Sequence, residues 1–142
     1  MSTARINTAR IDARIRPQDF LTDARVQVEL PEEYRFVYVN LLVYVVKLNA
    51  TNESRWTDGY FDPSIAPMVP GLTDAALDSM IAVGLVIENG ARLRLADFEM
   101  YQTSHEQLVK DAEDRAADAE RTGISPQTAS RRGDPTIRAH RR

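Results

Sequence analysis

The residues best placed to do chemistry are two arginines, Arg92 and Arg94, in the second half of a predicted β-hairpin. Asn89-Gly90 indicates the hairpin, because a type I′ turn needs positive φ at both central residues and this dipeptide accepts it. The two arginines alternate with leucines, so both cations lie on one face of the return strand. Guanidinium groups in this position are suited to contact the phosphates of a nucleic acid.

The helix expected just before this hairpin has the opposite charge. Thr73 is a favourable N-cap and the apolar spacing predicts a helix over residues 74–83. This helix would present Thr73 and Ser79 to a groove, but Asp74 and Asp78 give it two negative charges. It has no arginine, lysine, asparagine or glutamine to read bases. Any DNA affinity should therefore come from phosphate contacts and be sensitive to salt.

The surrounding pattern predicts an α+β winged helix-turn-helix fold, with a three-helix core and the β-hairpin as its wing. Residues 63–69 and 74–83 form two short helices separated by a tight Pro-Gly turn, and glycine at position 84 ends the second. Residues 32–49 are rich in β-branched and aromatic types, but their length favours a helix. Because that helix is apolar nearly all round, we expect it to be buried as the central core helix.

The remaining segments of the domain are shorter. Residues 13–16 alternate as a strand does, with Arg14 and Arg16 on one side, and Phe20 and Leu21 are expected to lie under the core. Residues 50–61 read as a polar loop with a short strand at residues 59–61. Trp56, the only tryptophan, lies in this loop, where it either folds back on the domain edge or anchors an interface.

Both ends of the chain are basic around an acidic body. Residues 1–16 hold four arginines and one aspartate, and residues 121–142 hold six arginines and one aspartate. A capping box beginning at Ser104 starts a charged, alanine-rich helix. We therefore expect four segments: a flexible basic arm (1–12), the winged-helix domain (13–103), a charged solvent-exposed helix (104–122) and a disordered basic tail (123–142).

Several classes of chemistry have no signature in the sequence. The chain has no cysteine, no Walker A loop and no glycine-rich dinucleotide turn, and its two histidines, His105 and His140, lie in the charged helix and the tail. We expect a protein that is not an enzyme and holds no cofactor or metal. The sequence contains no signal peptide or membrane-spanning run, so a cytoplasmic location is expected.

Four motifs resemble the N-terminal winged-helix domain of phage and prophage replication-initiator or replisome-organiser proteins of the DnaD-like kind, as found in actinobacterial phages. The motifs are Ala13-Arg14-Ile15-Arg16-Pro17, Leu30-Pro31-Glu32, Gly84-Leu85-Val86 and Phe98-Glu99-Met100-Tyr101-Gln102-Thr103-Ser104. The resemblance covers roughly residues 13–108. It implies DNA binding within a larger initiator or regulator of replication or transcription, in the cytoplasm of the host cell.

Two functional hypotheses follow. In the first, the protein binds double-stranded DNA, largely without base specificity. The expected contact residues are Arg14, Arg16, Arg92 and Arg94, Thr73 and Ser79 on the recognition helix, and Arg131 and Arg132 in the tail. In the alternative, the winged helix binds a replisome, transcription or host protein, through Trp56, Asp74 and Asp78.

Overall fold

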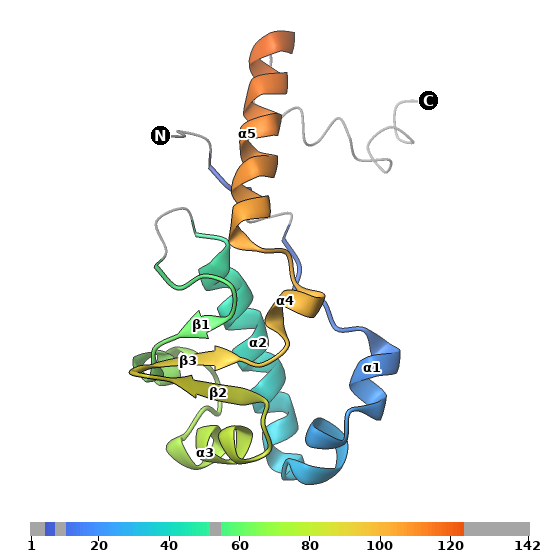
Figure 1. The fold of residues 1–142 in the computed structure, drawn as a ribbon, viewed down its shortest axis with the longest axis vertical. Helices are drawn as coiled ribbons and strands as arrows, with labels where there is room; N and C mark the ends of the chain where they lie inside the picture. Colours follow the sequence, from blue (N-terminus) through green and yellow to red (C-terminus); the bar gives the residue numbers. More distant parts are fainter. Residues whose placement is uncertain (1–4, 8–10, 52–54, 124–142) are drawn as a thin grey trace.

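The computed structural model describes residues 5–7, 11–51 and 55–123, which form an α+β arrangement of helices and one three-stranded antiparallel sheet (Figure 1). In chain order the elements are α1 (Pro17–Thr22), the π-helix η2 (Arg25–Glu29), the 3₁₀-helix η3 (Glu32–Tyr34), α2 (Arg35–Asn49), β1 (Tyr60–Phe61), the 3₁₀-helix η4 (Pro63–Met68), α3 (Asp74–Ala82), β2 (Val86–Asn89), β3 (Arg92–Leu95), α4 (Phe98–Tyr101) and α5 (His105–Thr122). The predicted contact residues Arg131 and Arg132 lie outside the described residues.

The long helix predicted for residues 32–49 is confirmed, with η3 as its first turn and α2 as the remainder. Leu41 and Val45 of α2 share one core with Phe61 and other buried residues of the sheet. The helix contributes to the core as expected, but it is not buried on every side, because Phe36 is 72% exposed and Val43 is 52% exposed. A domain of this size lacks the surface needed to wrap a central helix completely.

β3 is the central strand of the sheet, with β1 and β2 on either side of it. Arg94 lies opposite Tyr60 of β1 and Ile87 of β2 in the antiparallel register. The predicted alternation is confirmed, because the two leucines of β3 are buried in the core while Arg92 and Arg94 lie on the outer face. The predicted short strand around residue 60 is also present as β1.

The hairpin between β2 and β3 is present, but its turn differs from the expected one. Asn89 pairs with Arg92, so the two-residue loop is Gly90-Ala91. Gly90 has a φ of +64°, and neither Asn89 nor Ala91 has a positive φ. The predicted type I′ turn is therefore wrong, and a positive φ at the first loop position alone is the pattern of a type II′ turn. The Asn89 amide donates to the Tyr60 hydroxyl (3.2 Å), and this bond helps to hold Asn89 in β2 rather than in the turn.

The helix predicted for residues 74–83 is present as α3, which ends one residue earlier, and capping bonds define both of its ends. The Thr73 hydroxyl accepts a hydrogen bond from a backbone N–H of the first turn (3.1 Å). At the other end Gly84 has a φ of +85°, and the N–H of Leu85 donates to the Met80 carbonyl (3.0 Å). With a second bond from the Gly84 N–H to the Ile81 carbonyl (3.1 Å), this is a Schellman motif.

The N-terminal segment before α1 is not the strand that the alternation predicted. The backbone N–H of Arg14 donates to the Gln102 side-chain oxygen (2.9 Å), and its carbonyl accepts from the Gln102 side-chain nitrogen (2.7 Å). A side-chain amide thus replaces a neighbouring strand, so the segment is extended but outside the sheet. Phe20 packs against the core as expected, whereas Leu21 is 67% exposed, contrary to the expectation.

A buried amide joins the polar loop, the sheet and α5. Asn49, only 1% exposed, donates to the Thr103 carbonyl (2.9 Å) and accepts from the Asp58 N–H (2.8 Å). The Asp58 carboxylate accepts from the N–H of His105 (3.0 Å), and the Asp58 carbonyl accepts from the Arg94 side chain (3.2 Å). The His105 Nδ1 lies 2.5 Å from the Asn49 carbonyl, which only accepts, so Nδ1 carries the hydrogen.

The base of α5 packs in a second, smaller apolar cluster. This cluster contains Ile6, Ala50, Leu108 and Ala112. Beyond it, the helix rises away from the rest of the domain (Figure 1) and carries mainly charged and alanine residues. Within the described part of the chain, no helix is long and apolar enough to cross a membrane.

We predict that Gly59→Ala strongly destabilises the domain. Gly59 has a φ of +94°, and an added Cβ would lie 2.7 Å from the Phe98 Cβ. Backbone strain and the clash with a buried side chain should together lower the free energy of unfolding by about 2–4 kcal/mol. Gly90→Ala is the matched control, since a Cβ there meets nothing within 4 Å. Urea unfolding of both variants tests this, and equal losses would contradict the clash.

Candidate nucleic-acid interface

The outer face of the sheet gathers two arginines around one tyrosine. The guanidinium carbons of Arg92 and Arg94 lie 4.6 Å and 5.3 Å from the centre of the Tyr60 ring. The register explains this, because Tyr60 lies opposite Arg94 and Arg92 is the next residue along β3 on the same face. Cation–π attraction thus gives both predicted phosphate-binding side chains a fixed platform.

The two arginines differ in what else they contact. Arg94 forms an ion pair with Glu99 of α4 (2.7 Å) and donates to the Asp58 carbonyl (3.2 Å), and its side chain is only 22% exposed. Arg92 is exposed and, within the described residues, forms no ion pair. The charge of Arg94 is therefore balanced inside the fold, whereas Arg92 offers its charge to an external anion.

The other predicted arginines lie on the N-terminal segment beside α4. Both Arg14 and Arg16 are exposed, and the Arg16 guanidinium carbon lies 5.5 Å from the centre of the Tyr101 ring. α4 therefore contacts both arginine pairs, through Tyr101 to Arg16 and through Glu99 to Arg94. One short helix thus contacts both arginine pairs, with an aromatic ring against Arg16 and a carboxylate against Arg94.

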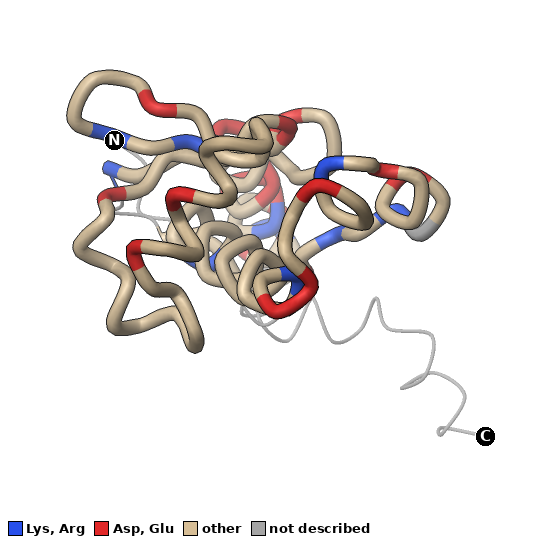
Figure 2. Tube along the Cα trace, turned by 90° about the horizontal axis from the view of Figure 1, so that it is seen from below, with Lys and Arg blue, Asp and Glu red and all other residues tan. Residues whose placement is uncertain are grey.

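The exposed surface of α3 is acidic, as its sequence predicts. Asp74 and Asp78 are exposed, Ser79 is half-buried, and the Thr73 hydroxyl is engaged in capping the helix. Figure 2 shows Asp and Glu positions spread along the chain as the molecule is seen from below. Two carboxylates on the predicted recognition helix repel a phosphate backbone, and they offer no guanidinium or amide to a base edge.

Trp56, expected either to fold back on the domain edge or to anchor an interface, is half-buried in the loop before β1. The guanidinium carbon of Arg55 lies 4.7 Å from the centre of its ring. A half-buried ring agrees with both alternatives, folding back on the domain edge and anchoring an interface, so both stay predictions.

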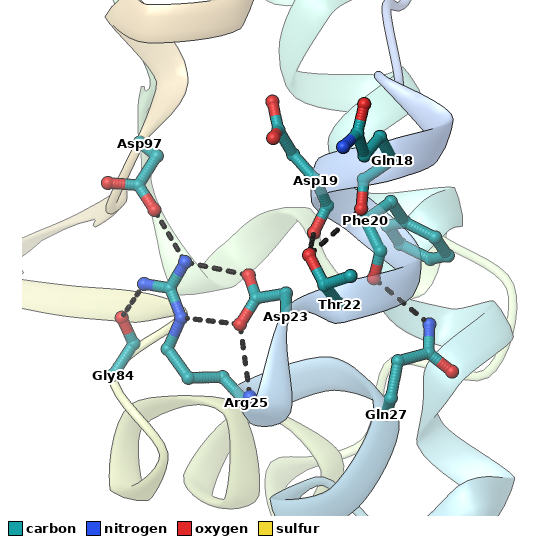
Figure 3. Close-up of polar contacts among 9 residues, drawn as sticks. All are labelled: Gln18, Asp19, Phe20, Thr22, Asp23, Arg25, Gln27, Gly84 and Asp97. Atoms are coloured by element: carbon teal, nitrogen blue, oxygen red, sulfur yellow. Dashed lines mark hydrogen bonds and ion pairs between the residues drawn. The ribbon is translucent and has the colours of Figure 1, made fainter.

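Sequence reasoning missed a clamp around Arg25 (Figure 3). Its guanidinium donates twice to Asp23 (2.8 and 3.0 Å), once to Asp97 (2.6 Å) and once to the Gly84 carbonyl (3.4 Å). The hydrogen bonds from Arg25 hold the pKa of the Asp23 carboxyl below its ordinary value of 3.8. The spacing of Asp23 and Arg25 hints at a local pair, but nothing in the sequence connects them with residues 84 and 97.

Two hollows adjoin the N-terminal segment, and Arg14 lines both of them. The larger, of about 490 Å³, is lined by Asp12, Asp111 and Asp114 as well as by Arg14 and Arg115, so it offers no cationic cluster to a phosphate. The smaller, of about 60 Å³, is lined in part by Tyr38, and burial raises the pKa of that hydroxyl to about 12. Tyr38 is therefore a neutral packing residue at physiological pH.

Comparison with protein-family models, with curated proteins and with solved structures gives no match for this chain. The family resemblance drawn from the four sequence motifs therefore stays a prediction.

We predict that Asp23 makes the stability of the domain depend on pH below about 4. Because its pKa is depressed in the fold, its stabilisation is present above the unfolded pKa and is lost as pH falls through the folded pKa. Asp23→Asn should lower the free energy of unfolding by about 1 kcal/mol at neutral pH, and the difference from the wild type should shrink in acid. Asp19→Asn, on the exposed side of α1, is the control. Urea unfolding at pH 7 and pH 3 measures both.

Proposed function

We propose that this protein binds double-stranded DNA as a winged helix-turn-helix protein, in the replication or transcription of a phage genome. The order η4, tight turn, α3 and β2–β3 hairpin supports this reading, since it is the order of two helices followed by a wing. The N–H of Leu72 donates to the Val69 carbonyl (3.0 Å), which closes the turn between the two helices.

The observation that carries the proposal is the state of Arg92. It is exposed at the tip of the hairpin, unpaired with any described acid, and held over the Tyr60 ring. A guanidinium in this state has lost part of its side-chain freedom before binding, and its planar donors match a phosphate group. An anchored arginine on a wing is suited to contact the DNA backbone.

The charge on α3 determines the expected mode of binding. Because Asp74 and Asp78 are exposed there, affinity should come from phosphate contacts around the hairpin and arm, with little reading of bases. Binding of this kind weakens steeply as salt rises. Arg94 contributes by fixing Tyr60 and α4, and its substitution would disturb the fold as well as the contact.

We predict that Arg92→Ala lowers affinity for a random duplex about three- to tenfold at low salt and reduces the salt slope by about one. Arg92→Lys, which keeps the charge, should lose less. Lys110→Ala on α5 is the control for the loss of one exposed cation elsewhere. Fluorescence anisotropy with a labelled duplex, at low and near-physiological salt, measures all three. Unchanged binding by Arg92→Ala would overturn the wing contact.

The same titration tests the predicted contacts of the tail. Replacing Arg131 and Arg132 together by alanine should reduce affinity further if those side chains also contact phosphates. If this double variant loses binding while Arg92→Ala keeps it, the DNA surface is the basic tail and not the wing.

A second candidate function follows from the exposed carboxylates of α3. A surface with Asp74 and Asp78 and no cation of its own is suited to bind a basic segment of a protein. Trp56 would supply an aromatic anchor for such a partner. The partner expected from the sequence is a replisome, transcription or host protein.

The combined variant Asp74→Asn with Asp78→Asn separates the two functions. If α3 faces DNA, removing two repelling charges should raise affinity for the duplex about two- to tenfold. If α3 faces a basic protein, DNA affinity should stay unchanged. Asp19→Asn with Glu29→Gln is the matched control, since it removes two exposed carboxylates from α1 and η2. Circular dichroism checks that α3 remains folded.

A further inference from the structure

The outward side of α2 is apolar and follows a regular spacing. Phe36 and Val43 are 72% and 52% exposed, and Lys47 is also exposed. These residues are separated by seven and four positions, so they lie on one side of the helix. A helix that is apolar nearly all round is normally buried all round, yet this side is uncovered by the described chain.

Acidic and basic residues stand at the two ends of this side. The outer stripe of α2 and its first turn consists of Glu32, Phe36, Val39, Asn40, Val43 and Lys47. The two central residues are half-buried, and the Asn40 amide donates to the Pro70 carbonyl (3.1 Å). Glu32 is exposed at one end and Lys47 at the other, and within the described residues neither forms an ion pair. The Lys47 ammonium lies 5.9 Å from the centre of the Tyr44 ring, which leaves its charge available.

We propose that the outer stripe of α2 is the interface of a symmetric homodimer, in which α2 of a second copy packs antiparallel to it. A two-fold axis midway between Val39 and Asn40 brings Phe36 opposite Val43 of the second copy. The same axis brings Glu32 opposite Lys47 of the second copy. Symmetry repeats both contacts, so the interface contains two apolar pairs at its centre and an ion pair at each end.

The order of residues favours a second copy over an unrelated partner. The apolar pair is equidistant from the centre of the stripe, and so are the two opposite charges, which is the requirement for a surface complementary to itself. Antiparallel packing also opposes the two helix dipoles favourably. Met68, 68% exposed, lies beside the stripe through its sulfur contact with the Tyr44 hydroxyl (3.2 Å) and extends the apolar area.

The dimer is independent of the proposed DNA contact. The outer stripe shares no residue with the face formed by Arg92, Arg94 and Tyr60. Variants that lose dimerisation should therefore still allow DNA binding to be measured, and variants that lose DNA binding should still dimerise.

Sedimentation velocity of the full chain over a series of concentrations tests the proposal. We expect the wild type to dimerise, and Phe36→Ser or Val43→Ser to raise the dimer Kd at least about tenfold, because truncated anchors at the centre of an interface are costly. Leu21→Ser is the matched control, since Leu21 is a 67% exposed apolar residue on α1, outside the stripe. Phe36 and Val43 are both exposed, so these variants should remain folded, which circular dichroism checks.

A charge exchange tests the antiparallel register. Lys47→Glu alone and Glu32→Lys alone should each weaken the dimer, since each places like charges opposite one another. The combined variant should recover most of the wild-type Kd, because the charges are then exchanged and again opposite in sign. Recovery depends on residues 32 and 47 meeting across the interface, so no other register predicts it.

Three outcomes would overturn the proposal. The first is a wild type that stays monomeric at every concentration, which would leave the stripe to a different partner. In the second, a dimer forms but is insensitive to Phe36→Ser and Val43→Ser, which places the interface elsewhere. In the third, the combined charge variant fails to recover, which rules out the antiparallel register.

Discussion

The buried side chain of Asn49 is the constraint on which the arrangement of this domain depends. An amide removed from water costs several kcal/mol unless its donors and acceptors are satisfied. Here one side of the amide is satisfied by the Thr103 carbonyl and the other by the Asp58 N–H. Asp58 in turn binds the first N–H of α5 and the side chain of Arg94. One buried amide therefore fixes the end of α2, the polar loop, the base of α5 and the central strand together.

Much of the fold could be predicted because local signals and burial agree. Thr73 and Gly84 delimit α3 through capping bonds that need only neighbouring residues, and the alternation in β3 fixes which side of the sheet is buried. The predicted N-terminal strand failed because a distant group replaced a neighbouring strand. Gln102 satisfies the backbone of Arg14 from 88 residues away, so an alternating segment is not a strand. No local pattern contains that information.

The sequence predicts which residues share the outer face of β3, but it does not predict which of their charges are neutralised within the fold. Alternation placed Arg92 and Arg94 together, and the structure agrees. The two arginines differ because only Arg94 contacts Glu99 of α4 and the carbonyl of Asp58 in the loop before β1. Two identical residues on one face thus differ in role, since one is neutralised within the fold and the other is exposed. Partners of this kind become visible only when tertiary contacts are known.

The Arg25 clamp has a consequence for the order in which the chain folds. Its bond to Asp97 closes a separation of 72 residues, whereas α3, the hairpin and the Asp23 contact involve near neighbours. Long-range contacts of this kind carry the largest loop-closure entropy and are expected to form after the local ones. The clamp also holds the carbonyl of Gly84, where α3 passes into β2. Opening of the N-terminal helices in hydrogen exchange should therefore expose the junction of α3 and the hairpin before the core of the sheet opens.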